Sequence, residues 1–220
     1  MVGKLKWLAL LLAVMSFAAR PAFADAYTTS ASFQAAIAGL PTATANFDDL
    51  TAGTIIPEGG TADRITFHYN VNGGADTLEI SNAFDTTSAP NYLGANDPTT
   101  GNGAFFGGDS ITMSFALPTN GVGMFIILAS DSAPGDFTLD TGSAQASSSG
   151  VIQQTFADRG QALFLGITSA TPFSSATISL DANAGYIWNL DDVTYTTPEP
   201  GSLLLLATGL GVFVRRIRKS

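Results

Sequence analysis

The sequence lacks cysteine and has few basic residues. Among its 220 residues there is one histidine, His68, and there are nine lysines and arginines against 18 aspartates and glutamates. Without cysteine, the chain can form neither disulfide bonds nor thiolate metal sites, although disulfides could persist in an oxidising compartment. With a single histidine, catalysis by a Ser-His-Asp set and zinc binding by histidines are disfavoured. Stability must therefore come from a packed core or from bound ions.

One apparent catalytic motif fails for the same reason. Gly108-Asp109-Ser110-Ile111 imitates the nucleophile block of GDSL-type hydrolases, but no histidine follows Ser110 to act as its base. The neighbours of His68 suit a strand, so a surface-facing or hydrogen-bonded histidine is expected. The sequence predicts no catalytic residue.

The basic residues gather at the two ends of the chain. Seven of the nine lie there: Lys4, Lys6, Arg20, Arg215, Arg216, Arg218 and Lys219. Residues 25–197 keep only Arg64 and Arg159 against 17 acidic residues, a formal charge of −15. Such a surface repels phosphate backbones, so we expect no nucleic-acid partner, whereas divalent cations and neutral glycans remain compatible.

The first 24 residues have the features of a secretory signal peptide. Lys4 and Lys6 precede the apolar run Trp7–Phe17, and Ala22-Phe23-Ala24 supplies a small-x-small cleavage pattern before Asp25. An uncleaved membrane anchor is the alternative, but the apolar run is short for a membrane span. We therefore expect the mature chain to begin at Asp25.

The last 23 residues have three parts. Pro198, Glu199 and Pro200 come first, the apolar stretch Gly201–Val214 follows, and Arg215, Arg216, Arg218 and Lys219 close the chain. The apolar stretch would make a helix about 21 Å long, against about 30 Å of membrane hydrocarbon, so it is a marginal span with a positive stop signal. A buried C-terminal core helix is the alternative, and the four basic residues oppose it.

This tail resembles the PEP-CTERM sorting signal of exported proteins of Gram-negative bacteria, which is also catalogued as the ice-binding protein C-terminal motif. The resemblance implies transient anchoring in the inner membrane, processing by an exosortase-type enzyme and delivery to the cell surface or beyond, often beside exopolysaccharide production in a biofilm matrix. Four segments of the exported part also look like such proteins: Phe33–Pro41, Asn46–Thr54, Gly108–Phe115 and Trp188–Val193. Ice binding is not carried over, because the sequence shows no regular threonine array.

Residues 25–197 are predicted to form one all-β domain. Alternation is clearest where Ile111, Met113, Phe115 and Leu117 share one strand face, which is expected to be buried. One short helix is expected from Ser32 to Ala38, with Ser32 as its possible cap. We predict a jelly-roll-like antiparallel β-sandwich with this helix, followed by a transmembrane sorting helix in residues 198–220. The expected strands are 64–71, 77–81, 110–117, 122–129, 136–140, 151–156, 161–168, 173–180 and 186–195.

Two pairs of aspartates suggest a metal site. Asp48 and Asp49 follow the first strand-like segment, and Asp191 and Asp192 lie in the last one. The first and last strands of a jelly roll commonly lie close together, and converging carboxylates need either a cation or hydrogen bonds. The pattern resembles the structural calcium of carbohydrate-binding jelly-roll modules, so a structural Ca²⁺ ion is one hypothesis. The other is that one aspartate of each pair caps a turn and its neighbour faces solvent.

The sequence thus predicts a non-enzymatic exported protein of the cell surface or extracellular matrix. The alternative is a carbohydrate-binding module with structural calcium, in which exposed aromatic residues stack on sugars; the candidates are Tyr92, Phe105, Phe106, Tyr186 and Trp188, with core packing as the default for Trp188. The third hypothesis is a glycoside hydrolase, which would need two carboxylates at a defined distance in a sugar-binding cleft.

Overall fold

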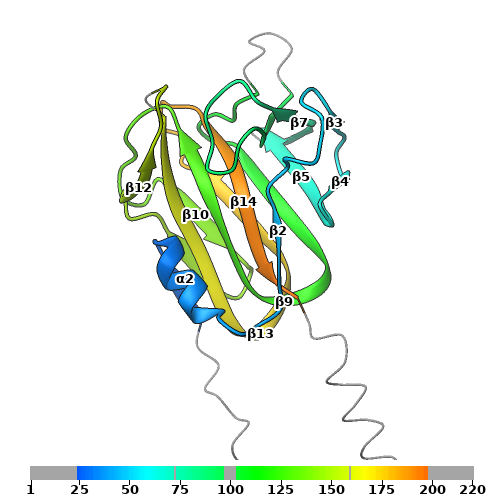
Figure 1. The fold of residues 1–220 in the computed structure, drawn as a ribbon, viewed down its shortest axis with the longest axis vertical. Coiled ribbons are helices and arrows are strands. Elements are labelled where there is room, and N and C mark those ends of the chain that lie inside the picture. Colours follow the sequence, from blue (N-terminus) through cyan, green and yellow to red (C-terminus); the bar gives the residue numbers. More distant parts are fainter. Residues whose placement is uncertain (1–23, 72, 97–102, 159, 198–220) are drawn as a thin grey trace, which may run out of the picture.

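The computed structural model describes residues 24–71, 73–96, 103–158 and 160–197 (Figure 1). These residues form fourteen strands and one short helix, α2 (Ser30–Ala36), and every strand pairing among them is antiparallel. The prediction of an antiparallel all-β fold with very little helix is confirmed.

Two long strands organise the fold. β9 (Ser110–Leu128) and β13 (Gln161–Leu180) pair along most of their length, from Gln161 opposite Leu128 to Ser179 opposite Ser110. The first half of β9 also pairs with β5 (Ile65–Val71), and its second half pairs with β14 (Trp188–Thr196). Because β9 and β13 change partners midway, they belong to two sheet layers that meet at a corner.

The remaining strands extend these two layers. The first layer runs β11-β10-β13-β9-β5 with β4 and β6 attached, and the second runs β13-β9-β14-β8-β7-β3 with β1, β12 and β2 attached. Their bounds are β1 Ala24–Tyr27, β2 Thr42–Ala45, β3 Ile55–Ile56, β4 Thr61–Ala62, β6 Gly74–Asp76, β7 Leu78–Ser81, β8 Tyr92–Ala95, β10 Phe137–Asp140, β11 Gln145–Ser147 and β12 Ile152–Thr155.

One part of the strand prediction is wrong, at the corner between the two layers. Residues 110–117 and 122–129 were expected to be separate strands, as were 161–168 and 173–180, but each pair is one continuous strand. Pro118, Asn120 and Gly121 read as a turn, yet side chains bridge the bend: Thr119 Oγ1 bonds to the Gly121 carbonyl, and Asn120 Nδ2 donates to the Ser169 carbonyl at 2.8 Å. The register shifts between Thr168 and Phe173, so the corner absorbs the extra residues as bulges.

The main core lies between the two layers. Ile111, Met113 and Phe115 point into it from the first half of β9, as their alternation predicted, and Val122, Met124 and Ile126 do so beyond the corner. The prediction was wrong for Leu117, which is 61% exposed because the strand bends at Pro118 and leaves the core there. Trp188 is also buried, with its ring 4.6 Å from that of Phe105, so core packing of Trp188 is confirmed. The alternation thus continues on both sides of the bend.

Helix α2 covers the outer face of the second layer. Its start is capped by Thr29, whose hydroxyl accepts the Ser32 backbone N–H, so the helix begins two residues earlier than predicted. Phe33 is fully buried against Phe164. A Cβ atom at Gly123 would lie 2.9 Å from the Phe33 ring, so glycine at this position lets the helix approach the sheet.

Both ends of the described chain lie at the corner end of the molecule, at the bottom of Figure 1. Ala24 pairs with Ser169 beside the corner, and the Thr197 N–H donates to the Pro41 carbonyl at 2.8 Å. The predicted cleavage before Asp25 would leave the new N-terminus inside strand β1. Among the described residues, no helix is long and apolar enough to cross a membrane. The predicted sorting helix lies outside them.

Candidate functional site

The first and last strands of the predicted sandwich do lie side by side. Strand β2 pairs with β14, with Ala45 opposite Val193, and this pairing brings the two aspartate pairs to the same region. Asp191 is completely buried and accepts hydrogen bonds from Thr86 Oγ1, from Thr87 Oγ1 at 2.9 Å and from the Ser88 backbone N–H at 2.9 Å. Asp191 therefore holds the segment that links β7 to β8.

Asp48 holds the other end of the same segment, because its Oδ1 accepts the Asn91 N–H at 3.1 Å. Asp49 faces solvent, and the Asp192 N–H donates to Asp191 Oδ1 at 2.7 Å. In the described part of the chain, no three His, Cys, Asp or Glu residues gather into a group that could hold a metal ion. The hypothesis that all four aspartates converge into a calcium site is therefore not supported; hydrogen bonds take the place expected for a cation.

The burial of Asp191 changes its acidity. Removal from water raises the pKa of its carboxyl from 3.8 to about 6, although the Thr86 hydroxyl and the Ser88 N–H act in the opposite direction. The neighbouring carboxylate of Asp192 raises the pKa further. The Asp191 carboxyl is thus a buried titratable group whose structural role is to fix a loop.

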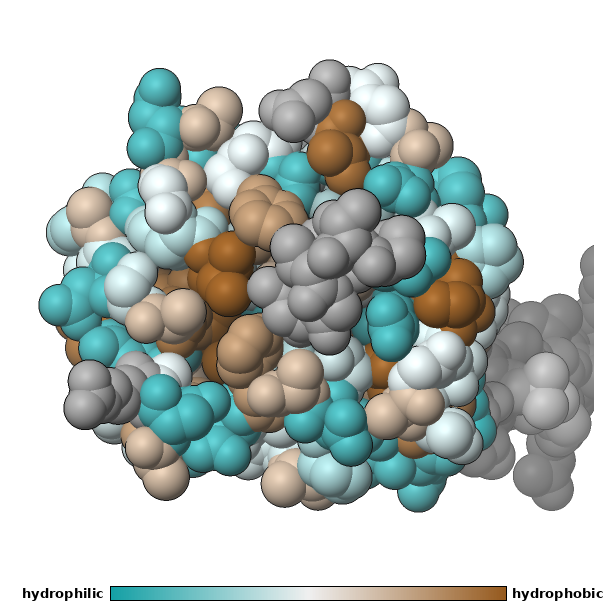
Figure 2. Space-filling view, turned by 90° about the horizontal axis from the view of Figure 1, so that it is seen from above, coloured by the Kyte–Doolittle hydropathy of each residue, from teal (hydrophilic) through white to brown (hydrophobic). Residues whose placement is uncertain are grey.

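The loop that Asp191 fixes forms one wall of a hollow at the end opposite the corner, which Figure 2 shows from above with hydrophobic residues recessed among hydrophilic ones. Phe84 lines this hollow and stacks on Tyr92, with ring centroids 6.3 Å apart. Asp85 and Asp158 join two loops beside it, since each carboxylate accepts the backbone N–H of the other residue. The hollow measures about 180 Å³ and is lined by Phe84, Ile127, Leu128, Ala129, Asp158, Gly160, Ile187 and Asn189. We call it the distal hollow.

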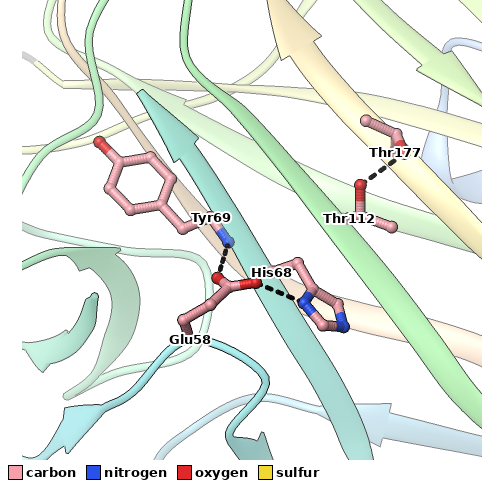
Figure 3. A network of polar contacts seen from close by, with 5 residues as sticks. All are labelled: Glu58, His68, Tyr69, Thr112 and Thr177. Atoms are coloured by element: carbon pink, nitrogen blue, oxygen red, sulfur yellow. Dashed lines mark hydrogen bonds and ion pairs between the residues drawn. The ribbon is translucent and has the colours of Figure 1, made fainter. Parts of the chain in front are cut away.

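A second surface follows from the register of the first layer. Its outward positions are hydroxyl-bearing on adjacent strands, for example Thr112 opposite Thr177 and Ser114 opposite Thr66. Thr112 Oγ1 and Thr177 Oγ1 lie 2.8 Å apart and share a hydrogen bond (Figure 3). We call this surface the hydroxyl face; it consists of Thr66, Ser110, Thr112, Ser114, Thr138, Ser175, Thr177 and Ser179, all half-buried.

The hydroxyl face contains a shallow hollow of about 410 Å³ over β10 and β13. Two ionisable side chains lie at opposite edges of the hydroxyl face. Asp140 is exposed and lines the hollow, and His68 on β5 contacts Glu58 Oε1 through its Nδ1 (Figure 3). Glu58 Oε2 also accepts the Tyr69 N–H at 3.1 Å. The prediction of a surface-facing, hydrogen-bonded His68 is confirmed.

Two sequence features have structural roles instead of chemical ones. Asp109 of the hydrolase-like block is buried and accepts hydrogen bonds from the Tyr69 hydroxyl at 2.7 Å and the Phe106 N–H at 2.8 Å, while burial raises its pKa. Of the aromatic candidates for sugar stacking, Tyr92, Phe105 and Trp188 are buried, whereas Phe106 is exposed. The sequence did not single out Phe84, the aromatic residue of the distal hollow.

The comparisons with known proteins decide the nature of the tail. Residues 196–219 match the model of the PEP-CTERM protein-sorting motif. The chain carries a PEP-CTERM sorting signal. This signal marks an exported protein that is anchored at its C-terminus, sorted by an exosortase-type system and delivered to the surface. Pro198, Glu199, Pro200, Arg215, Arg216, Arg218 and Lys219 fall within the matched range and lie outside the described residues.

No curated protein matches this PEP-CTERM chain. One solved structure that is similar to it is named "Crystal structure of Agl-KA catalytic domain". The two are 15% identical with a TM-score of 0.35, and the similarity covers 70% of this chain. The PEP-CTERM chain spans only 30% of the length of that structure's chain.

Proposed function

We propose that this PEP-CTERM protein is a non-enzymatic component of the cell surface or extracellular matrix that associates with neutral exopolysaccharide through its hydroxyl face. The observation that carries the proposal is the ordered row of hydroxyls across β5, β9, β13 and β10. Hydroxyl groups both donate and accept hydrogen bonds, as the hydroxyls of sugars do. Thr197, the last described residue, lies at the corner end.

The charge of the domain favours an uncharged partner. Residues 25–197 have a formal charge of −15, and none of the eight residues of the hydroxyl face is basic. Anionic polymers would be repelled, because the face has no lysine or arginine and His68, opposite Thr112, is already paired with Glu58. A neutral glycan does not face this penalty.

The expected binding is weak at each sugar and depends on polymer length. A hydrogen bond to an exposed hydroxyl replaces one to water, so its net contribution is only about 1 kcal/mol. Many such contacts along one polymer add through effective concentration, even when each is weak. We therefore expect retention on the polymer and no measurable binding of short oligosaccharides.

The test is co-sedimentation of the purified full-length chain with neutral polysaccharide from the producing strain. Thr112→Val/Thr177→Val removes both partners of one hydroxyl pair while keeping side-chain shape, and we expect loss of most of the retention. Thr44→Val/Thr194→Val removes a matched cross-strand pair, 2.9 Å apart, on the other layer and should bind like wild type. Equal retention of the two variants would remove the support for the hydroxyl face.

A second candidate is a discrete carbohydrate-binding module that uses the distal hollow. Phe84 offers an aromatic wall, and Asp158 and Asn189 offer polar groups, the combination that sugar sites commonly need. This reading predicts that a short oligosaccharide binds and that Phe84→Ala abolishes the binding. Titration calorimetry with oligosaccharides prepared from the same polymer distinguishes it from the hydroxyl-face proposal.

The proposal that the protein is not an enzyme has chemical support. Asp191 has the raised pKa of a general acid, but it is fully buried and occupied by hydrogen bonds. Asp85 and Asp158 at the distal hollow are engaged with each other's backbone N–H groups. A glycoside hydrolase needs two carboxyl groups that reach one glycosidic bond. Release of reducing sugar by wild type, lost in Asp158→Asn, would favour the hydrolase.

A further inference from the structure

The turn after α2, the bends within β9 and β13 and both ends of the described chain meet at the corner end. The Thr197 N–H bonds to the carbonyl of Pro41, and Thr119 Oγ1 lies 2.9 Å from Thr196 Oγ1. Asn120 reaches across to the Ser169 carbonyl, and Ser169 pairs with Ala24. We define the proximal end as residues 38–41, 117–120 and 169–172 together with Ala24 and Thr197.

The proximal end carries no charged side chain in an otherwise acidic domain, in which residues 25–197 have a formal charge of −15. Cleavage before Asp25 would add one ammonium group and the Asp25 carboxylate beside Thr168, and these two charges cancel. Leu117 is 61% exposed and Leu40 is 48% exposed, both high for large apolar side chains. Pro118, Ala170 and Pro172 beside them are exposed as well. Each of the three segments thus exposes apolar side chains at the corner end.

The sorting tail begins at once beyond this end. Only four peptide steps separate Thr197 from Gly201, the start of the apolar stretch, and they can span at most about 14 Å. When the apolar stretch is in the membrane, so short a connection keeps the proximal end close to the headgroups.

We infer that the proximal end rests on the bilayer surface while the tail is anchored, with Leu40 and Leu117 in the interfacial layer. Apolar side chains gain free energy when they leave water, and an uncharged end avoids the repulsion that anionic headgroups exert on the acidic remainder. This inference rests on the anchored stage of export, not on glycan binding. The contact would present Pro198-Glu199-Pro200 at the membrane surface, where a membrane-bound processing enzyme can reach it.

The absence of cysteine allows a direct test, because one introduced thiol is a unique labelling site. The full-length chain is reconstituted in phosphatidylcholine vesicles containing a minority of phosphatidylglycerol and a nitroxide-bearing lipid. A fluorophore is attached at Ala170→Cys in the proximal end or at Val151→Cys, which is 51% exposed elsewhere. Ile152 pairs with Leu163, seven residues along β13 from Ala170, so the two labels are separated by about 23 Å along the strand.

We expect the lipid-borne quencher to remove most of the fluorescence at position 170 and little at position 151. Leu40→Ser/Leu117→Ser should lower the quenching at position 170, because only the short connection then holds this end near the headgroups, whereas Ile55→Ser, a change at an apolar side chain that is 45% exposed away from the proximal end, should leave it unchanged. Equal quenching at both positions, or quenching at position 170 that Leu40→Ser/Leu117→Ser leaves unchanged, would overturn the inference while leaving export intact. A chain that does not sediment with the vesicles would overturn the anchoring itself and the inference with it.

Discussion

Asp191 allows the most quantitative prediction, because its carboxyl is fully buried and its pKa is raised to about 6 from 3.8. The folded state therefore holds the proton more tightly than the unfolded state does. Its contribution to stability is fully present below about pH 4 and is lost as the pH rises through 6. A difference of about two pKa units corresponds to about 3 kcal/mol in the free energy of unfolding.

Asp191→Asn isolates this contribution, since the amide does not titrate. The substitution also leaves the Ser88 N–H or another donor without its acceptor, at a cost of about 1–3 kcal/mol that does not depend on pH. The measured quantity is the free energy of unfolding of wild type minus that of the variant. We expect this difference to fall by about 2 kcal/mol between pH 4 and pH 7, with most of the change below pH 6.

The assay is urea unfolding of the full-length chain in detergent, followed by tryptophan fluorescence, because Trp188 reports on the core. Wild type and variant are measured at matched pH values, so the other acidic residues cancel. A difference that stays flat from pH 4 to pH 7 would show that burial does not perturb the group. A difference that grows with pH would mean that the hydrogen-bond donors stabilise the carboxylate more than burial penalises it.

Three further predictions concern packing, metal and sorting. A Cβ at Gly94 would lie 1.6 Å from the Gly103 carbonyl oxygen, so Gly94→Ala should lower the free energy of unfolding by about 3 kcal/mol in the same urea titration. Gly185 has open space around it, so Gly185→Ala should change the free energy of unfolding little. Since the Asp48 and Asp191 carboxylates already accept protein hydrogen bonds, excess EDTA and millimolar Ca²⁺ should give the same melting temperature by calorimetry; a rise with Ca²⁺ would restore the calcium hypothesis. Replacing Arg215, Arg216 and Arg218 by glutamine should weaken the stop signal, so that less chain is retained and processed on immunoblots of membrane fractions; unchanged processing would refute this role.

Local patterns in the sequence predicted the fold class and several individual residues. The alternation correctly placed Ile111, Met113 and Phe115 in the core but wrongly included Leu117, and Gly, Pro and Asn clusters marked most strand limits. The continuity of β9 through Pro118 could not be predicted in this way. It depends on bonds from Thr119 and Asn120, and the Asn120 side chain reaches a residue 49 positions away along the chain.

The candidate surfaces could not be predicted from the sequence either, because they too depend on residues far apart along the chain. Thr112 and Thr177 are 65 residues apart, and only the register of β9 against β13 places their hydroxyls together, so no threonine array is visible along the chain. The acidic pairs did point to the right region, but the sequence could not reveal that Thr86, Thr87 and Ser88 supply donors to Asp191. Phe84 lies in the loop that Asp191 fixes, and its place at the distal hollow depends on this long-range contact, which no local pattern indicates.

The central claim is that the PEP-CTERM signal delivers an acidic β domain to the cell surface. The most direct measurement is fractionation of a producing strain and of an isogenic strain without its exosortase, with the chain followed by an antibody against the domain. The account predicts that the chain reaches the surface or the medium in the first strain and accumulates uncleaved in the inner membrane in the second. The same distribution and the same apparent mass in both strains would contradict it.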